Sequence, residues 1–195
     1  MMNRVGIFSG TFDPIHQGHI GFALEARRLC ELDEVIFAAE RNPRAKQGVM
    51  DIAHRTALIE RAIQDTAGLR SLTLKSERFT VKNTLREIQS LFPGASLTLL
   101  IGSDVARTLL YRWEGLDVLL RQVTLVIGMR AGAVQAETVA IMDQLAKEYG
   151  LPITYRLVSV PHAHMASSDI RAGRAASAQL HPATLEYIEK YKLYT

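Results

Sequence analysis

Short apolar runs alternate along the chain with segments whose apolar side chains recur every three or four residues. The apolar runs predict strands at residues 4–9, 34–39, 71–76, 97–101, 123–129 and 153–160. The other segments predict amphipathic helices that begin near residues 18, 51, 80, 168 and 182, and one marked by residues 142–149. This alternation is typical of an α/β fold whose sheet is mainly parallel.

The turn after the first predicted strand, residues 10–19 (GTFDPIHQGH), combines several features that suit an anion. The helix that follows offers unpaired backbone N–H groups and the positive end of its dipole. Gly10 leaves room for a ligand to approach the backbone. His16 and His19 are three residues apart, so both project to one side of the first helical turn. We expect the two imidazoles to hold a phosphate that gains charge during a reaction.

Two other interpretations of the histidine pair are open, namely a purely structural turn and a metal site. A zinc site needs a third and a fourth ligand at suitable spacing. The single cysteine, Cys30, lies on a helix face that the pattern predicts to be buried. Asp13 is expected to fix the turn or to cap the helix. We therefore predict no metal ion held by protein ligands alone.

Residues 10–19 resemble the G-x-F-D-P-x-H-x-G-H signature of the HxGH nucleotidyltransferase superfamily, whose members transfer AMP or CMP to a phosphorylated acceptor. The resemblance runs from the first strand to the last helix and is closest to bacterial nicotinate (nicotinamide) mononucleotide adenylyltransferases. It implies a Rossmann-like, doubly wound α/β fold with helices on both faces of a mainly parallel sheet, in one domain over residues 1–195. It also implies that His16 and His19 are catalytic. The implied ATP-binding residues of this turn are Gly10, Thr11, Phe12 and Gly18.

A second motif at residues 166–171 (ASSDIR) follows the last predicted strand. Its two hydroxyls can cap a helix start, and the N–H groups there can hold phosphate oxygens. Arg171 can add a bidentate contact. Taken alone, the motif is more typical of an ordinary cap with a solvated arginine. It resembles the I-S-S-T-x-I-R element of the same superfamily, which implies that Ser167, Ser168 and Arg171 grip the β- and γ-phosphates of ATP, Arg171 as a catalytic residue.

Four further positions follow from the resemblance. Gly102 and Asp104, after the fourth predicted strand, resemble a G-x-D element whose carboxylate helps to hold the nucleotide sugar, although Asp104 is equally placed to be a helix N-cap. Trp113, the only tryptophan, corresponds to an aromatic residue against the nicotinate ring, although a lone tryptophan is often partly buried core. Thr84 corresponds to a segment that lines the acceptor pocket.

The loop at residues 41–46 (RNPRAK) carries three cations in six residues. A solvated loop is the default interpretation, but its position after the second strand favours phosphate contact by Arg44 and Lys46. Nicotinate-type enzymes usually have two adjacent prolines followed by His or Lys here, and this chain departs from that pattern. Its N-P-x-x-K spacing is similar to phosphopantetheine adenylyltransferases, which usually have Thr at the position of His16. The departure leaves the phosphorylated acceptor open.

Composition limits the class of partner. The 195 residues are 48% hydrophobic, and no apolar run approaches the roughly 20 residues that span a bilayer. The N-terminal residues lack a signal-peptide pattern, and one cysteine suits a reducing cytoplasm, so we expect a cytoplasmic protein with no membrane partner. The net charge of +3 suits an anionic small substrate and is too scattered to predict nucleic-acid binding. The sequence leaves the oligomeric state open.

The candidate residues all follow strands, and ligands of such sheets bind beyond the carboxyl ends of the strands, near the reversal of strand order. The expected reaction is in-line attack by an acceptor phosphate on the α-phosphorus of ATP, with Mg²⁺ carried on the ATP oxygens. By resemblance the acceptor is nicotinate mononucleotide, with nicotinamide mononucleotide next. The alternatives are another acceptor, such as phosphopantetheine, and a non-catalytic nucleotide sensor. His162 and His164 are given no role.

Overall fold

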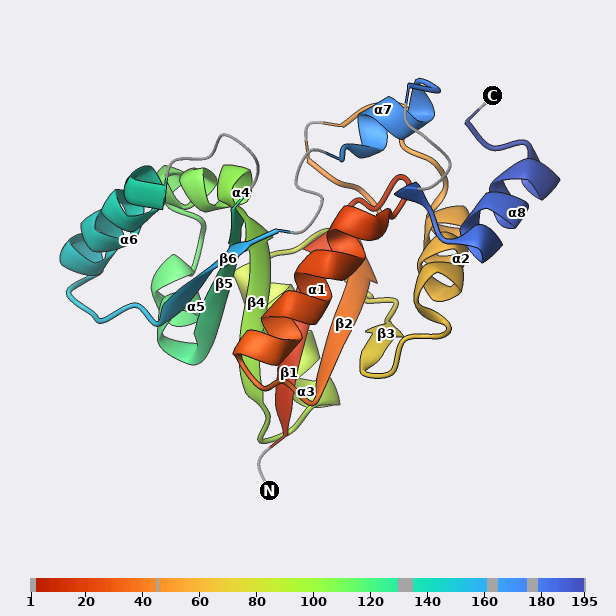
Figure 1. Ribbon diagram of the computed structural model, residues 1–195. Coiled ribbons are helices and arrows are strands. Elements are labelled where there is room, and N and C mark those ends of the chain that lie inside the picture. Colours follow the sequence, from red (N-terminus) through yellow and green to blue (C-terminus); the bar gives the residue numbers. More distant parts are fainter. Residues whose placement is uncertain (1–2, 45, 130–134, 161–164, 175–178, 195) are drawn as a thin grey trace.

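The strands form one parallel sheet in a computed structural model that describes residues 3–44, 46–129, 135–160, 165–174 and 179–194 (Figure 1). The six strands are β1 (Arg4–Gly10), β2 (Glu34–Ala39), β3 (Leu69–Ser71), β4 (Ser96–Gly102), β5 (Val123–Met129) and β6 (Tyr155–Ser159). Their order is β3-β2-β1-β4-β5-β6, and every neighbouring pair is parallel. The order therefore reverses between β1 and β4, which confirms the predicted doubly wound, Rossmann-like fold.

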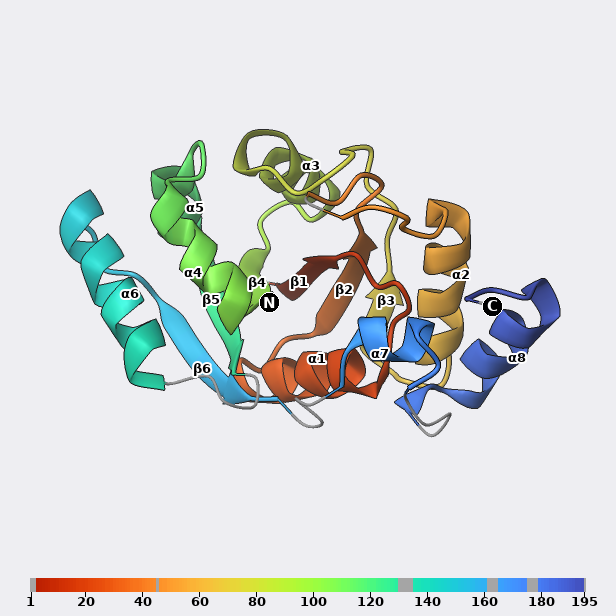
Figure 2. The same ribbon diagram turned by 90° about the horizontal axis from the view of Figure 1, so that it is seen from above.

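Helices cover both faces of this sheet. Figure 2 shows α1 on one face, and α3 and α5 on the other. The helices are α1 (Gln17–Leu29), α2 (Ile52–Ile63), η1 (Val81–Leu85), α3 (Arg86–Leu91), α4 (Ser103–Thr108), η2 (Leu109–Tyr111), α5 (Leu116–Gln122), α6 (Gln135–Tyr149), α7 (Ser167–Arg171) and α8 (Pro182–Tyr191). Across the described ranges, no helix has the length and apolar character needed to cross a membrane.

Two hydrophobic clusters lie on opposite faces of the sheet. Ile7 and Ile36 belong to the cluster under α3, α5 and α6, whereas Phe8 and Phe37, one residue along, belong to the cluster under α1 and α2. Alternate strand residues point to opposite faces, and both faces are covered here, so the strand sequences are almost continuously apolar. This is why the apolar runs predicted the central strands well.

The third predicted strand, residues 71–76, was placed wrongly: β3 is Leu69–Ser71. The segment after Ser71 leaves the sheet because the Glu87 carboxylate accepts hydrogen bonds from the backbone N–H groups of Lys75 and Ser76, at 2.7 and 3.2 Å. A strand would have needed those groups for its ladder. The loop that results carries residues 78–80 toward the carboxyl ends of the strands.

The Glu87→Gln variant is expected to lower the free energy of unfolding by about 1 kcal/mol at neutral pH, since a neutral amide accepts weaker hydrogen bonds than a carboxylate. Burial alone would raise the pKa of Glu87, but the hydrogen bonds from Lys75 and Ser76 outweigh it and lower the pKa. Because the pKa of Glu87 is lower in the folded than in the unfolded protein, the ionised side chain stabilises the fold at pH values above the unfolded pKa of about 4.3. This stabilisation is lost as the pH falls through the folded pKa. Urea unfolding should show a difference in the free energy of unfolding between parent and variant at neutral pH, and this difference should disappear in acid. A constant difference across the pH range would contradict this account.

Candidate active site

A cavity of about 730 Å³ opens at the carboxyl ends of the strands, at the point where the strand order reverses between β1 and β4. Its volume lies within the range of small-molecule sites, and its position is where ligands of doubly wound sheets bind. Nearly all of the residues predicted from the sequence line it. These are Gly10, Thr11, Phe12, His16, Gly18, His19, Arg44, Lys46, Gly102, Asp104, Trp113, Ser167, Ser168 and Arg171.

The two histidines lie side by side at the start of α1. His16 is the N-cap residue and His19 is in the first turn, and their ring centroids are 3.7 Å apart with 33° between the planes. The backbone N–H of His16 donates to Nδ1 of His19 at 3.2 Å. In a neutral ring this bond places the proton of His19 on Nε2, where it is a donor for an anionic oxygen. The sequence spacing therefore gave the right arrangement.

The ring of Phe12 supports His19 from within the turn. Phe12 has a positive φ of 49°, a left-handed conformation that is costly for an aromatic residue. Its buried ring packs edge-on against His19 and Phe8, with centroids 5.2 Å from each. A Cβ at Gly10 would come within 3.0 Å of this ring. Gly10 therefore makes room for Phe12 as well as lining the cavity.

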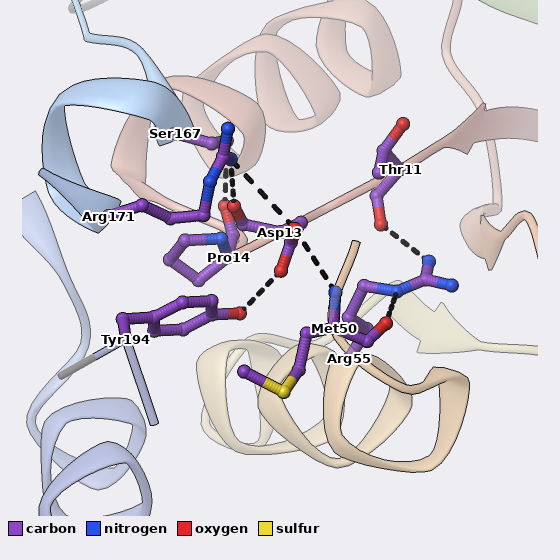
Figure 3. Close-up of polar contacts among 8 residues, drawn as sticks. All are labelled: Thr11, Asp13, Pro14, Met50, Arg55, Ser167, Arg171 and Tyr194. Atoms are coloured by element: carbon purple, nitrogen blue, oxygen red, sulfur yellow. Dashed lines mark hydrogen bonds and ion pairs between the residues drawn. The ribbon is translucent and has the colours of Figure 1, made fainter. Parts of the chain in front are cut away.

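Asp13 holds the turn in place through a buried carboxylate (Figure 3). The residue is 3% exposed. Its Oδ1 accepts a hydrogen bond from the Tyr194 hydroxyl at 2.7 Å, and its Oδ2 accepts one from the Met50 backbone N–H at 3.4 Å. Asp13 thus fixes the turn, the role that the sequence favoured over metal binding.

Helix α7 is tied directly to the histidine turn. The Ser167 hydroxyl donates to the Pro14 carbonyl at 2.9 Å, and the Arg171 guanidinium donates to the Asp13 carbonyl at 2.6 Å. The predicted capping of this helix by hydroxyls was wrong: the N-cap is Ala166, because the Ser167 side chain reaches across to Pro14. The side chain of Arg171 is 40% exposed, so its remaining N–H groups are accessible to a ligand in the cavity.

Asp104 lies in the first turn of α4, while Gly102 is the N-cap. The alternative in which Asp104 caps this helix is therefore wrong. A Cβ at Gly102 would collide with Oδ1 of Asp104, so the carboxylate can lie over the end of β4 only because residue 102 is glycine. Both residues line the cavity. The arrangement presents a carboxylate beside the end of β4, at the start of α4.

Two aromatic rings form another wall of the cavity. The half-buried Trp113 lies 6.3 Å from Phe79 between ring centroids, with 51° between the planes. Glu40 holds Phe79 by accepting its backbone N–H at 3.0 Å. Thr84 differs from the sequence prediction, because it is fully buried behind this wall and does not line the cavity. Its hydroxyl accepts from the Thr80 N–H and donates to the Arg78 carbonyl.

Comparison with known proteins assigns the family. The family model described as "Cytidylyltransferase-like" matches residues 7–173, which is most of the chain. The chain belongs to the cytidylyltransferase-like family. This confirms the resemblance to HxGH nucleotidyltransferases that residues 10–19 predicted.

Relatives in this family match along nearly their whole length. A protein of Clostridium perfringens strain 13, named "Probable nicotinate-nucleotide adenylyltransferase", is 30% identical over 99% of this chain and 98% of its own. A protein of the same name from Desulfitobacterium hafniense is 32% identical over 98% of this chain and 95% of its own. The solved structure of Plasmodium falciparum nicotinic acid mononucleotide adenylyltransferase complexed with NaAD shares the fold, with a TM-score of 0.75, 20% identity and coverage of 98% and 97%.

Arg55, which the sequence analysis missed, supports the histidine turn of this site without lining the cavity. It projects from α2, is 1% exposed, and donates to the carbonyls of Met50 and Thr11 at 2.7 Å and of Glu40 at 2.8 Å. Burial lowers the pKa of Arg55 and the nearby Asp13 carboxylate opposes this, so the guanidinium stays charged at neutral pH. The sequence contained one indication of its burial, because Arg55 is a cation on the same helix face as the apolar Ile52 and Ile59.

Tyr194 and Phe79 were also missed, because their contacts join residues far apart in the chain. Tyr194 meets Asp13 across 181 positions, and Phe79 meets Glu40 across 39. No periodic pattern in the sequence marks such pairs. His162 and His164 lie outside the described residues.

Proposed function

We propose that this chain transfers AMP from ATP to the 5′-phosphate of nicotinate mononucleotide, releasing pyrophosphate, as a cytoplasmic step in NAD biosynthesis. The observation that carries the proposal is that one cavity joins the His16 and His19 rings, the Arg171 guanidinium of α7 and the aromatic wall at Trp113. The full-length relatives named as probable nicotinate-nucleotide adenylyltransferases support it. In this proposal residues 1–195 act as a single domain.

The reaction needs no nucleophile from the protein, because the acceptor phosphate is already an anion. One of its oxygens bonds to the α-phosphorus of ATP as the bond from that phosphorus to the leaving pyrophosphate breaks, in line. In the proposal His16 and His19 donate to phosphate oxygens around the α-phosphorus, where charge develops. Ser168 and the accessible N–H groups of Arg171 hold the pyrophosphate as it leaves.

The phosphates carry more charge than these groups supply. In the proposal Arg44 and Lys46, both exposed at the cavity rim, add positive charge beside the acceptor phosphate. Among the described residues, no three His, Cys, Asp or Glu side chains form a metal site. Mg²⁺ usually binds through substrate phosphates and keeps several waters, so the proposal brings it in on ATP. It would neutralise charge on the phosphate oxygens.

The aromatic wall accounts for the choice of acceptor. A pyridine ring can stack on Trp113, and Phe79 places a second ring on the same side of the cavity. Phosphopantetheine has no aromatic ring and would make no use of this pair. The proposed acceptor is therefore a pyridine mononucleotide, nicotinate mononucleotide first and nicotinamide mononucleotide second.

A pyrophosphate-release screen tests the proposal. ATP or CTP is incubated with the full chain, Mg²⁺ and each of nicotinate mononucleotide, nicotinamide mononucleotide and phosphopantetheine. The expected result is release with ATP and nicotinate mononucleotide at the highest kcat/KM. Preference for phosphopantetheine would contradict the proposed acceptor. Tight ATP binding with no release for any acceptor would contradict catalysis and favour a nucleotide sensor.

The Asp104→Ala variant is expected to weaken ATP binding about tenfold or more, since a hydrogen bond from the ribose to a charged group is worth roughly 1.5–3 kcal/mol. Gly102→Ala should have a similar effect, because its Cβ displaces the Asp104 carboxylate. Equilibrium titration with ATP measures both, with Asp117→Ala, at the start of α5, as the control. Parent-like ATP affinity in both variants would remove Asp104 from the proposed nucleotide site.

A further inference from the structure

The end of the chain folds back onto the histidine turn. Helix α8 ends at Tyr191, the C-cap residue Lys192 has a left-handed φ of 51°, and the chain then reverses direction. Leu193 is buried in the hydrophobic cluster beneath α1 and α2. The next residue, Tyr194, packs against the same cluster and reaches Asp13 with its hydroxyl (Figure 3). The anchored Leu193 thus sets where the Tyr194 hydroxyl lies.

The Tyr194 hydroxyl acts as a hydrogen-bond donor to the Asp13 carboxylate. Burial raises the pKa of Tyr194 far above its usual value, and the hydrogen bond to the Asp13 carboxylate raises it further. The hydroxyl therefore keeps its proton at neutral pH. A donor to a buried carboxylate makes a strong, charge-assisted bond, consistent with the oxygen–oxygen distance of 2.7 Å.

Asp13 connects this tail to the catalytic elements. Its carboxylate is held by Tyr194 and by the Met50 N–H, while its carbonyl accepts from Arg171. The guanidinium of Arg171 also lies 3.9 Å from Oδ2 of the same carboxylate, at the limit of an ion pair. The carboxylate thus lies between a neutral donor from the tail and a cation that lines the cavity.

We propose that Tyr194 is a positioning residue for the proposed adenylyl transfer: its hydroxyl holds the Asp13 carboxylate away from a closer ion pair with Arg171. Without the hydroxyl, Oδ1 loses its donor, and the nearest charged group that lines the cavity is the Arg171 guanidinium. The carboxylate then turns toward Arg171 and takes N–H groups that the leaving pyrophosphate needs. The histidine turn, which contains Asp13, loosens at the same time. The inference rests on the proposed function for its kinetic test.

The Tyr194→Phe variant tests this, because it removes the hydroxyl and keeps the ring. The matched control is Tyr191→Phe on α8, a residue that is 48% exposed and whose ring packs against Tyr187. The expected result is a fall of about tenfold to a hundredfold in kcat, with the KM for the acceptor within about twofold of the parent, since the charge on the leaving group is greater in the transition state than in bound ATP. The control should keep the parent's kcat and KM.

Repeating the Tyr194→Phe substitution in the Arg171→Ala protein separates an effect on the position of Asp13 from a general loss of structure. In Arg171→Ala protein the cavity-lining guanidinium that the carboxylate would capture is absent, so adding Tyr194→Phe should change kcat by less than about twofold. If Tyr194→Phe keeps the parent's kcat, or lowers kcat by the same factor in both backgrounds, the inference is overturned.

Hydrogen–deuterium exchange without substrate gives a readout that needs no activity. Backbone amides of residues 11–19 should exchange about tenfold faster in Tyr194→Phe than in the parent, and at the parent's rate in Tyr191→Phe. If the parent releases no pyrophosphate, the proposed function fails and exchange alone decides whether Tyr194 holds the turn. If exchange in this segment is unchanged, the inference fails while the proposed function stands.

Discussion

The His19→Gln variant is expected to transfer AMP about 10²–10⁴-fold more slowly than the parent, because it replaces an imidazole at the developing charge with a neutral amide. Glutamine at this position can still accept the His16 backbone N–H, as Gln does at the third position of many helices. The start of α1 should therefore stay folded. His16→Asn is expected to give a loss of similar size, because the His16 ring that it removes lies against His19 and lines the same cavity.

Steady-state kinetics with ATP and nicotinate mononucleotide measures this loss, with thermal unfolding run in parallel. The matched control is His54→Gln, since His54 lies on α2 outside the lining of the cavity and contacts Tyr187. Its kcat should stay within about twofold of the parent. A His19→Gln protein that keeps the parent's kcat would remove the histidine pair from the mechanism.

The Arg55→Met variant is expected to lose about 3–5 kcal/mol of the free energy of unfolding. The substitution keeps much of the apolar side chain but leaves the part-buried carbonyls of Thr11, Met50 and Glu40 without the Arg55 donor. For a chain of this size such a loss lowers the melting temperature by roughly 10 °C or more. Because these carbonyls belong to the histidine turn and the loop after β2, AMP transfer should fall as well.

The control for Arg55 is Arg61→Met on the same helix. Arg61 donates to the Ala57 carbonyl and lies over the Tyr187 ring at 4.2 Å, contacts that are worth about 1 kcal/mol near the surface. Urea unfolding of the two variants compares the same Arg→Met substitution at a buried position and at a position near the surface. Equal losses in the two proteins would show that the carbonyl contacts of Arg55 contribute little.

The sequence predicted the fold well where local patterns determine structure. The central strands are buried on both faces, so their apolar runs are unmistakable, and α1 begins at Gln17, close to the expected start. The two motifs, at residues 10–19 and 166–171, were placed correctly at one cavity because both follow parallel strands. Their assigned roles in ATP binding and catalysis stay predictions until variants are measured.

What the sequence did not predict depends on contacts between distant side chains. β3 is short because Glu87, from the following helix, captures two backbone N–H groups. Ser167 caps nothing because its hydroxyl reaches Pro14, and Thr84 supports the aromatic wall from behind. Arg55 had a visible signal as a cation on an apolar helix face. The contact between Tyr194 and Asp13 had none, since the two residues meet only after the whole chain has folded.

One measurement tests the central claim, that the paired histidines in this cavity carry AMP transfer to a pyridine mononucleotide. ATP, Mg²⁺ and nicotinate mononucleotide are incubated with the parent and with the His16→Asn/His19→Gln double variant, and the products are identified by mass spectrometry. The account predicts equimolar dinucleotide and pyrophosphate from the parent, and at least a hundredfold less of both from a folded double variant. Formation of the dinucleotide at the parent's rate by the double variant would contradict it.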